Sequence, residues 1–431
     1  MAVERLRILY IAHYFPPLGS SAALRSLKMV KYLADCGIDC IVLTTQPWGL
    51  RDPKDKELNR EIPKGSIIHR YWTPEITWLY KALWGLKLHK LVEWISKNLM
   101  RPDNIILARP LVWRAAKRIM RTEPRPALAV ISAGPFSLLT LGPKLKKKYR
   151  LPYICDWRDE WTNNPERINQ NYPPRAQARE QAQEAVILAQ ASGIVYLTRL
   201  MRDNFHEVHP ELRATAYRVI PNGYDEADFS GFQALDHKSG KLRILYTGSF
   251  YDRRQPDNLW RALRELIDEG AIDQKQIEII IMGKNTRAFV FGAFRDDEQI
   301  QAIVKFLPYA PHRESIQHMQ YADLLLIYIP SGANTQSILT GKIFEYLRTG
   351  KPILALAPLD GLAAEIVREA GTGFVADYAD IEGIKTQILR LWTLWRDGKL
   401  GEIKADAEYV RQFDRKQQAG VLGGLIEEAL G

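Results

Sequence analysis

The stretch Arg7-Ile-Leu-Tyr-Ile-Ala12 recurs almost unchanged later in the chain as Arg243-Ile-Leu-Tyr-Thr-Gly248. Each copy is a short apolar run typical of a buried strand, and each is followed by further apolar runs separated by helix-length segments. Strands that alternate with helices in this way form parallel sheets. The repeat therefore predicts an α/β chain with two domains, each built on its own parallel sheet.

The first 45 residues show the pattern of one strand–helix–strand unit, with strands predicted over Leu6–Ala12 and Cys40–Thr45. The helix between them is predicted to start at Ala22 and to stop at Gly37. Its apolar face consists of Ala23, Leu27, Val30 and Ala34. Further strands of this domain are expected at Ala127–Ser132, Pro152–Asp156, Gly193–Thr198 and Arg218–Pro221.

The second series of strands begins with the repeat at Arg243. Its other strands are expected at Ile277–Gly283, Leu324–Tyr328, Ile353–Ala357 and Gly373–Asp377. We therefore assign residues 1–224 to a first domain, 225–241 to a linker and 242–405 to a second domain. Residues 406–431 are expected to form a C-terminal helix, with a return to the first domain as one option. Because open α/β sheets bind ligands at the carboxyl ends of their strands, one cleft between the domains is expected.

Composition narrows the partners and the compartment. The chain has 431 residues, of which 46% are hydrophobic, enough for two separate cores. Its net charge of +10 favours acidic partners such as nucleotide phosphates, anionic lipids or nucleic acid. The three cysteines, Cys36, Cys40 and Cys155, have no spacing suited to zinc and indicate a reducing cytoplasm. No apolar run approaches the roughly 18 residues of a membrane span, so a soluble or peripheral protein is expected.

The segment from Arg70 to Arg121 is rich in basic residues and contains Trp72, Trp78, Trp84, Trp94 and Trp113. One helical face within it carries Trp84, Leu88, Leu91, Ile95 and Leu99. An amphipathic helix with basic flanks is typical of a membrane surface, so residues 72–121 are a candidate contact with an anionic inner membrane face. A helix packed in the core with a solvated basic flank is the alternative.

The segment Thr340-Gly-Lys-Ile-Phe-Glu-Tyr-Leu-Arg-Thr-Gly-Lys-Pro352 carries the strongest chemical signal. Thr340 is a suitable N-cap, Gly341 permits close approach of the backbone, and the helix should end at Gly350. A diphosphate at this helix N-terminus would meet free N–H groups and Lys342. Glu345, one turn further, has the geometry to accept both hydroxyls of a ribose, unless it is a surface glutamate paired with a neighbouring base.

A second loop, Gly19-Ser20-Ser21, joins the first strand to the first helix, where backbone N–H groups can meet a phosphate or a sugar oxygen. An ordinary strand-to-helix turn is the alternative for this loop. The chain has neither Gly-x-Gly-x-x-Gly after a strand nor a Gly-Lys-Ser/Thr loop, which argues against a dinucleotide dehydrogenase and a P-loop enzyme.

Five stretches together resemble glycosyltransferase family 4, the retaining enzymes of the GT-B fold. They are Phe15-Pro-Pro-Leu-Gly-Ser20, Cys155-Asp-Trp-Arg-Asp-Glu-Trp161, Val219-Ile-Pro-Asn-Gly-Tyr-Asp225, Tyr246-Thr-Gly-Ser249 and Gly341-Lys-Ile-Phe-Glu-Tyr-Leu347. The resemblance implies two Rossmann-like domains whose parallel sheets face a central cleft. It also implies transfer of a hexosyl group from a nucleoside-diphosphate sugar to an acceptor hydroxyl, with retention. The basic, tryptophan-rich segment 70–121 favours a glycan or lipid-linked acceptor, in the assembly of a cell-surface polysaccharide or glycolipid.

The resemblance further implies donor-binding roles for particular positions. The family places a glutamate at Glu345 against the donor ribose, and a second glutamate where this chain has Ser337, which leaves the donor sugar open. Arg254 occupies the position of a lysine that neutralises the diphosphate just after Gly248. Ser249 replaces the usual arginine, for which Arg253 is the candidate substitute. Arg254 and Lys342 would stabilise the departing diphosphate without a metal ion or other cofactor.

On the acceptor side, the resemblance places Asp156, Arg158 and Asp159 near the reacting carbon, where one carboxylate would orient or deprotonate the acceptor hydroxyl. A structural salt bridge between Arg158 and an aspartate is the alternative, and His13 is a weaker candidate. Two other activities stay open at this point. A nucleotide-sugar 2-epimerase uses a similar frame, whereas a nucleic-acid-binding protein would need a binding module that the sequence does not contain.

Overall fold

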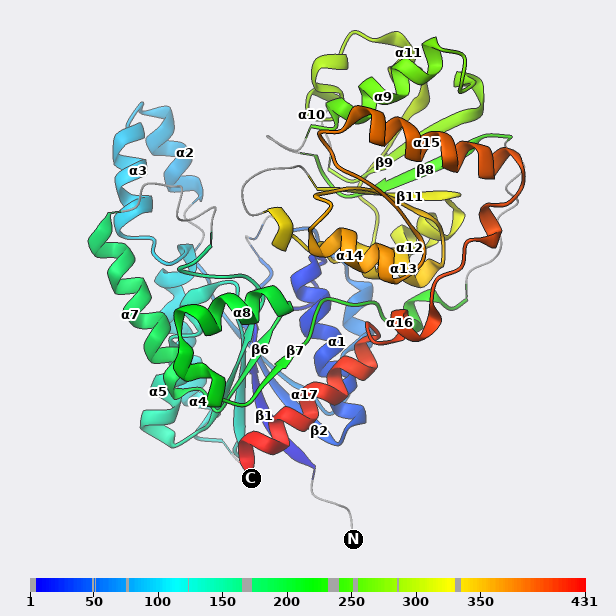
Figure 1. Cartoon of the computed structure of the whole chain (residues 1–431). Coiled ribbons are helices and arrows are strands. Elements are labelled where there is room, and N and C mark those ends of the chain that lie inside the picture. The colour runs from blue at the N-terminus through cyan, green and yellow to red at the C-terminus, as the bar shows by residue number, and fades with distance from the viewer. Residues whose placement is uncertain are drawn as a thin grey trace. The chain divides into compact units, whose positions relative to one another are not determined.

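The computed structural model describes residues 5–48, 50, 52–74, 77–122, 124–164, 173–231, 240–250, 255–284, 287–329 and 335–431. The chain divides into two compact units, each with its own sheet (Figure 1). The first unit comprises Met1–Pro221 together with Arg415–Gly431, and the second comprises Asn222–Asp414.

The first unit is built on a parallel sheet of seven strands in the order β3-β2-β1-β4-β5-β6-β7. The strands are β1 Leu6–Ile11, β2 Ile38–Thr45, β3 Ile67–Tyr71, β4 Leu128–Ser132, β5 Tyr153–Trp157, β6 Gly193–Tyr196 and β7 Tyr217–Val219. The predicted strands are confirmed here within one or two residues at each end. Their continuous apolar runs reflect a sheet that helices cover on both faces.

Helices cover both faces of this first sheet. On one face, the core is formed with α1 Ser21–Asp35 and α17 Arg415–Leu430. On the other, it is formed with α4 Arg109–Ile119, α5 Leu141–Tyr149, α7 Pro174–Gln190 and α8 Arg199–Val208. Helix α17 belongs to this unit although the whole second unit separates it from β7 in sequence, and its Leu422, Leu425 and Ile426 are buried against α1 and the sheet.

The second unit has a parallel sheet of six strands in the order β10-β9-β8-β11-β12-β13. The strands are β8 Leu242–Thr247, β9 Ile277–Met282, β10 Val304–Leu307, β11 Leu324–Tyr328, β12 Ile353–Leu356 and β13 Gly373–Ala376. One face packs on α9 Asp257–Asp268, α10 Arg287–Phe291, α11 Glu298–Ile303 and α15 Ile381–Arg396. The other packs on α12 His312–Tyr321, α13 Lys342–Thr349, α14 Leu362–Glu369 and α16 Ala407–Arg411. Residues 222–229, which overlap the predicted linker, pack in this unit through Tyr224 and Phe229.

Sequence patterns missed one edge strand in each sheet, β3 and β10. The sequence of β3 is Ile-Ile-His-Arg-Tyr and that of β10 is Val-Lys-Phe-Leu. An edge strand has a neighbour on one side only, so it tolerates basic side chains that interrupt the apolar run. Both strands were missed for this reason.

The predicted amphipathic helix around residues 84–99 is instead two helices, α2 Thr77–Gly85 and α3 His89–Asn98, which pack against each other (Figure 1). The prediction of one continuous face was wrong because Lys87, with φ of 57°, turns the chain between them. None of the residues of α3 is buried. The exposed large side chains are Trp84, Leu86, Leu88, Leu91, Trp94 and Leu99, so a core-packed helix is not what this segment forms.

Candidate functional site

In the second unit, the end of β8 and the start of α13 are tied together by side chains from both. The Lys342 Nζ donates to the carbonyl of Thr247 at 2.7 Å and lies 3.7 Å from the ring centroid of Tyr246. The buried Tyr346 hydroxyl lies 3.0 Å from Thr247 Oγ1 and accepts from the Thr247 N–H at 2.9 Å. Two predicted donor-binding segments, about 95 residues apart in sequence, therefore meet at one place.

Gly248 continues this cluster directly after β8. Its φ is +140°, a backbone conformation that side chains other than glycine rarely adopt. The Gly248 N–H donates to the Met282 carbonyl at 2.8 Å. A Cβ atom at Gly248 would lie 2.8 Å from the Lys342 Nζ. The absence of a side chain is therefore what allows the lysine ammonium to lie against the end of the strand.

Glu345 lies one turn into α13 and has a partner that sequence reasoning did not find. Its Oε1 is 2.7 Å from the His312 Nε2, and the His312 Nδ1 is 3.6 Å from a carboxylate oxygen of Asp228. All three side chains are largely but not fully buried, with 13–17% of each exposed. His312 therefore lies between two acids and orients the carboxylate of Glu345. The sequence gives no signal of this pairing, because the histidine is 33 residues away from Glu345.

The start of α13 differs from its prediction. The N-cap residue is Gly341, in helical geometry and without a side-chain cap, so the N-cap role predicted for Thr340 is wrong. The helix starts one residue later than expected, and within the described residues the buried Thr340 Oγ1 has no hydrogen-bond partner. Its end is as predicted, because Gly350 adopts the left-handed conformation with φ of 69°.

The remaining donor candidates fall near or outside this cluster. Ser337 ends a short 3₁₀ turn, Thr335–Ser337, and is half-buried. Arg253 and Arg254 lie outside the described residues.

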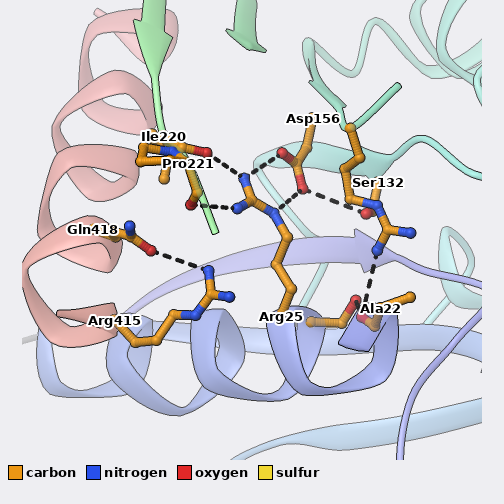
Figure 2. A network of polar contacts seen from close by, with 10 residues as sticks. Ala22, Arg25, Ser132, Asp156, Ile220, Pro221, Arg415 and Gln418 are labelled. Carbon is orange, nitrogen blue, oxygen red and sulfur yellow. Dashed lines mark hydrogen bonds and ion pairs between the residues drawn. The ribbon is translucent and has the colours of Figure 1, made fainter. Parts of the chain in front are cut away.

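In the first unit, Asp156 at the end of β5 is held in a buried ion pair with Arg25 of α1 (Figure 2). The guanidinium donates to the two carboxylate oxygens at 2.8 and 3.2 Å. It also donates to the carbonyls of Ile220 and Pro221 at 3.0 and 2.8 Å, and Ser132 Oγ donates to the same carboxylate at 3.3 Å. Helix α1, strand β5 and the chain after β7 are thus joined at one point.

The ion pair with Arg25 sets the ionisation state and the hydrogen bonding of the Asp156 carboxylate. Burial by itself would raise the pKa of Asp156, but the Arg25 guanidinium outweighs burial and holds that pKa below its usual value. Only 3% of the residue is exposed, and both oxygens already accept hydrogen bonds. A buried carboxylate that stays ionised, with both oxygens hydrogen-bonded, is poorly suited to receive a proton, so this geometry favours a structural role for Asp156 over the predicted catalytic one.

The neighbouring residues Arg158 and Asp159 differ from Asp156. Arg158 Nη1 donates weakly to the Ala22 carbonyl at 3.4 Å, and Gly134, with φ of +86°, leaves room for the guanidinium. The salt bridge considered between Arg158 and an aspartate is therefore made by Arg25 instead. Asp159 is exposed just beyond the carboxyl end of β5, so that its side chain has access to solvent.

The loop at Gly19 and Ser20 uses its polar groups internally. The Gly19 N–H donates to the Pro53 carbonyl at 2.8 Å, and the Ser20 Oγ caps α1 by accepting from the Ala23 N–H at 3.4 Å. These two groups already have partners, as the ordinary-turn alternative expects. His13 is likewise a packing residue, because it is buried, its Nδ1 lies 2.9 Å from the Tyr71 hydroxyl, and burial lowers its pKa to about 4.

Each of the two units matches a model of a known protein family. A glycosyl transferase 4-like domain matches residues 20–223, and a glycosyl transferases group 1 domain matches residues 241–393. Together the two models cover most of the chain, and the first match ends within two residues of the boundary between the units. The protein is therefore a glycosyltransferase, and the chain belongs to the group 1 family of these enzymes.

Solved structures show the same fold along nearly the whole chain. A sucrose-phosphate synthase from Thermosynechococcus elongatus is 16% identical, with a TM-score of 0.63 and 98% of each chain covered. Anabaena HepE, in complex with UDP-glucose, is 17% identical, with a TM-score of 0.56 and coverage of 98% of this chain and 99% of that one. A trehalose-phosphate synthase (UDP-forming) from Burkholderia xenovorans, in complex with glucose-6-phosphate, is 11% identical, with a TM-score of 0.61 and 99% of each chain covered. These similarities confirm the GT-B fold, whereas no curated protein matches the chain by sequence.

Among the described residues, no helix is both long and apolar enough to cross a bilayer.

Proposed function

We propose that the protein transfers a hexosyl group from a nucleoside-diphosphate sugar to an acceptor hydroxyl, with retention at the anomeric carbon. The observation that carries this proposal is the cluster at the start of α13, where Gly248, Lys342 and Glu345 come together on the second unit. The similarity to HepE in complex with UDP-glucose makes uridine the first base to test.

Each group of the cluster has a task on the donor. The Lys342 ammonium, now on the neutral carbonyl of Thr247, would move to the stronger acceptor that a diphosphate oxygen provides. The start of α13, which has no side-chain cap, would add backbone N–H donors and the positive end of the helix dipole. Glu345, oriented by His312, would accept the ribose hydroxyls, and Arg254 would neutralise the leaving diphosphate. We propose that these groups replace a metal ion in stabilising the leaving group.

Asp159 is the carboxylate of the first unit that we propose acts on the acceptor. It is exposed at the carboxyl edge of the sheet, where open α/β sheets bind their ligands. In a retaining transfer by front-face attack, the leaving phosphate takes the acceptor proton, so Asp159 would orient the hydroxyl rather than hold the proton alone.

Helices α2 and α3 support a membrane-proximal or lipid-linked acceptor. They expose Trp84 by 61% and Trp94 by 54%, and lysines such as Lys87 and Lys90 flank these side chains. Amphipathic segments of this composition lie in the interface of anionic bilayers. We therefore propose that the α2–α3 pair anchors the enzyme where a cell-surface polysaccharide or glycolipid is assembled.

Thermal unfolding in the presence of UDP, GDP and ADP tests the donor site, because a ligand that binds only the folded state raises its stability. We expect one nucleotide to raise the midpoint, and Glu345→Ala and Gly248→Ala each to abolish most of that rise. Alanine at Gly248 would push away the Lys342 ammonium, which lies 2.8 Å from the new Cβ. Glu298→Ala, an exposed glutamate of the same unit at the start of α11, is the matched control and should respond like the parent protein.

An undiminished rise in the Glu345→Ala variant would remove that residue from the donor site. Incubation with the sugar nucleotide alone separates transfer from epimerisation. Isomerised sugar without acceptor would replace the transferase proposal with a 2-epimerase.

A further inference from the structure

A basic groove lies in the first unit, between the edge strand β3 and the outer face of α4. It encloses about 900 Å³, a volume in the range that binds ligands of several hundred daltons. Its walls come from two segments, residues 69–72 at the end of β3 and residues 110–121, which run along α4 and just beyond its end. Neither segment contributes to the donor cluster, which belongs to the second unit.

Four cations lie on the α4 side of the basic groove. Lys117 and Arg118 lie three and four residues after Arg114, which places these three on one face of α4, and Arg121 follows just beyond the end of the helix. At a rise of about 1.5 Å per residue, Arg114 and Arg118 are about 6 Å apart along the axis of α4. In the described part of the chain, none of the four forms an ion pair with a carboxylate. Arg70 differs, because the carbonyls of Thr45 and Pro16 hold its guanidinium.

Aromatic side chains form the rest of the lining. Trp72 is 59% exposed at one end of the basic groove, and Trp113 is half-buried against Tyr149. An exposed indole offers a flat apolar surface on which the face of a pyranose ring can pack. Rows of unpaired cations repel one another, so an anion that binds them relieves that repulsion. The exposed indole and the row of cations together favour an extended ligand that contains sugar rings and carries negative charges along its length.

We propose that the basic groove binds an acidic glycan, a chain of sugars carrying carboxylate or phosphate groups, as the already assembled part of the acceptor. This inference rests on the proposed transferase function and names the acceptor class. Trp72 directly follows β3 at the carboxyl edge of the parallel sheet, the same edge as Asp159. A glycan whose terminal hydroxyl lies at that edge extends from Trp72 along the row of cations towards Arg121.

Other anions fit the basic groove less well. A single phosphate would occupy one or two of the four cations and leave the indoles uncovered. A bilayer presents a broad surface, for which the exposed side chains of α2 and α3 are better suited than a recessed groove. The spaced charges together with the aromatic end favour an extended chain of sugars.

Binding of tetragalacturonate to the whole protein, measured by calorimetry without donor, tests the proposal. We expect Arg114→Ala combined with Arg118→Ala to weaken binding about tenfold or more and to reduce its salt dependence. Trp72→Ala should weaken binding without changing the salt dependence, since it removes packing and no charge. The control, Lys147→Ala combined with Lys275→Ala, removes two exposed lysines elsewhere and should bind like the parent. Maltotetraose, which is neutral, should bind much more weakly than the acidic chain.

Each of the following results would overturn the proposal. Equal affinities of the arginine double variant and the lysine control would show that the basic groove is not the site. Equal binding of maltotetraose would show that charge does not matter. The third result concerns other partners, single-stranded RNA and vesicles of phosphatidylcholine and phosphatidylserine. If one of these binds in a way that depends on Arg114 and Arg118, and tetragalacturonate does not bind, the basic groove is a site for that partner. The nucleotide-induced rise in unfolding temperature is measured on the same variants, so a normal rise with no glycan binding refutes this inference alone.

Discussion

Substitution of Arg25 by alanine tests whether the buried ion pair at Asp156 stabilises the first unit or serves catalysis. The guanidinium makes four hydrogen bonds, two to the carboxylate and two to backbone carbonyls, and 1% of Arg25 is exposed. Removing one partner of a buried pair leaves an uncompensated charge, which costs about 3–5 kcal/mol. Ser132 would remain as a hydrogen-bond donor to Asp156, so we expect the lower half of that range.

A control of the same chemistry is available at Arg5 and Asp39, an ion pair of 2.9 Å in the same unit whose arginine side chain is 47% exposed. Arg5→Ala should cost at most about 1 kcal/mol, because solvent screens an exposed pair. Replacing both members of the buried pair by leucine or methionine should cost less than the sum of the two single substitutions, since no lone charge is left.

Urea unfolding combined with hydrogen exchange is the suitable assay, because exchange reports β5 separately from the strands of the second unit. Arg25→Ala should accelerate exchange in β5 well before that in β11. Equal losses for Arg25→Ala and Arg5→Ala would refute the reasoning. A fully stable Asp156→Asn variant that has lost turnover would return Asp156 to a catalytic role.

Two further predictions concern the first unit. Burial, together with the nearby Glu160 and Glu180, raises the pKa of Glu184 from 4.5 to about 7. Between these two pH values the folded protein keeps this proton while the unfolded chain has lost it. The free energy of unfolding should therefore fall by about 3 kcal/mol as the pH rises from about 4.5 to about 7. Glu184→Gln should flatten that fall in urea midpoints measured across this range, and a slope equal to that of the parent would contradict the assignment. Trp84→Ser combined with Trp94→Ser should reduce sedimentation with anionic vesicles about tenfold or more, because two exposed indoles no longer enter the interface. Trp48→Ser, at a tryptophan that is 77% exposed outside α2 and α3, is the control, and equal losses from both would show that the effect is not specific to this pair of helices.

The central strands could be predicted from the sequence because they are buried on both faces and therefore appear as unbroken apolar runs. The two segments of the proposed donor cluster, 246–249 and 340–347, could be singled out for a related reason, because their local pattern of strand end and helix start is visible without knowledge of the fold. The structure brings the two segments into contact, and their binding of a donor stays a prediction. Edge strands β3 and β10 lack this signal, since basic residues interrupt them.

Pairings between distant segments were beyond the sequence. Arg25 is 131 residues from Asp156 and lies on a helix where a charged residue is ordinarily solvated, so nothing in the local pattern indicates burial. His312 was missed in the same way, because its link to Glu345 depends on how α12 packs against α13. The break between α2 and α3 depends on one residue, Lys87, in a conformation that lysine rarely adopts.

The place of α17 has a consequence for how the protein is made. On the ribosome, residues 1–221 emerge first, yet the core over α1 lacks Leu422, Leu425 and Ile426 until the last helix has been synthesised. The apolar side chains that α17 covers in the first unit therefore stay exposed while the entire second unit is translated. Chaperone dependence and sensitivity to C-terminal fusions should therefore appear in the half of the protein that is translated first.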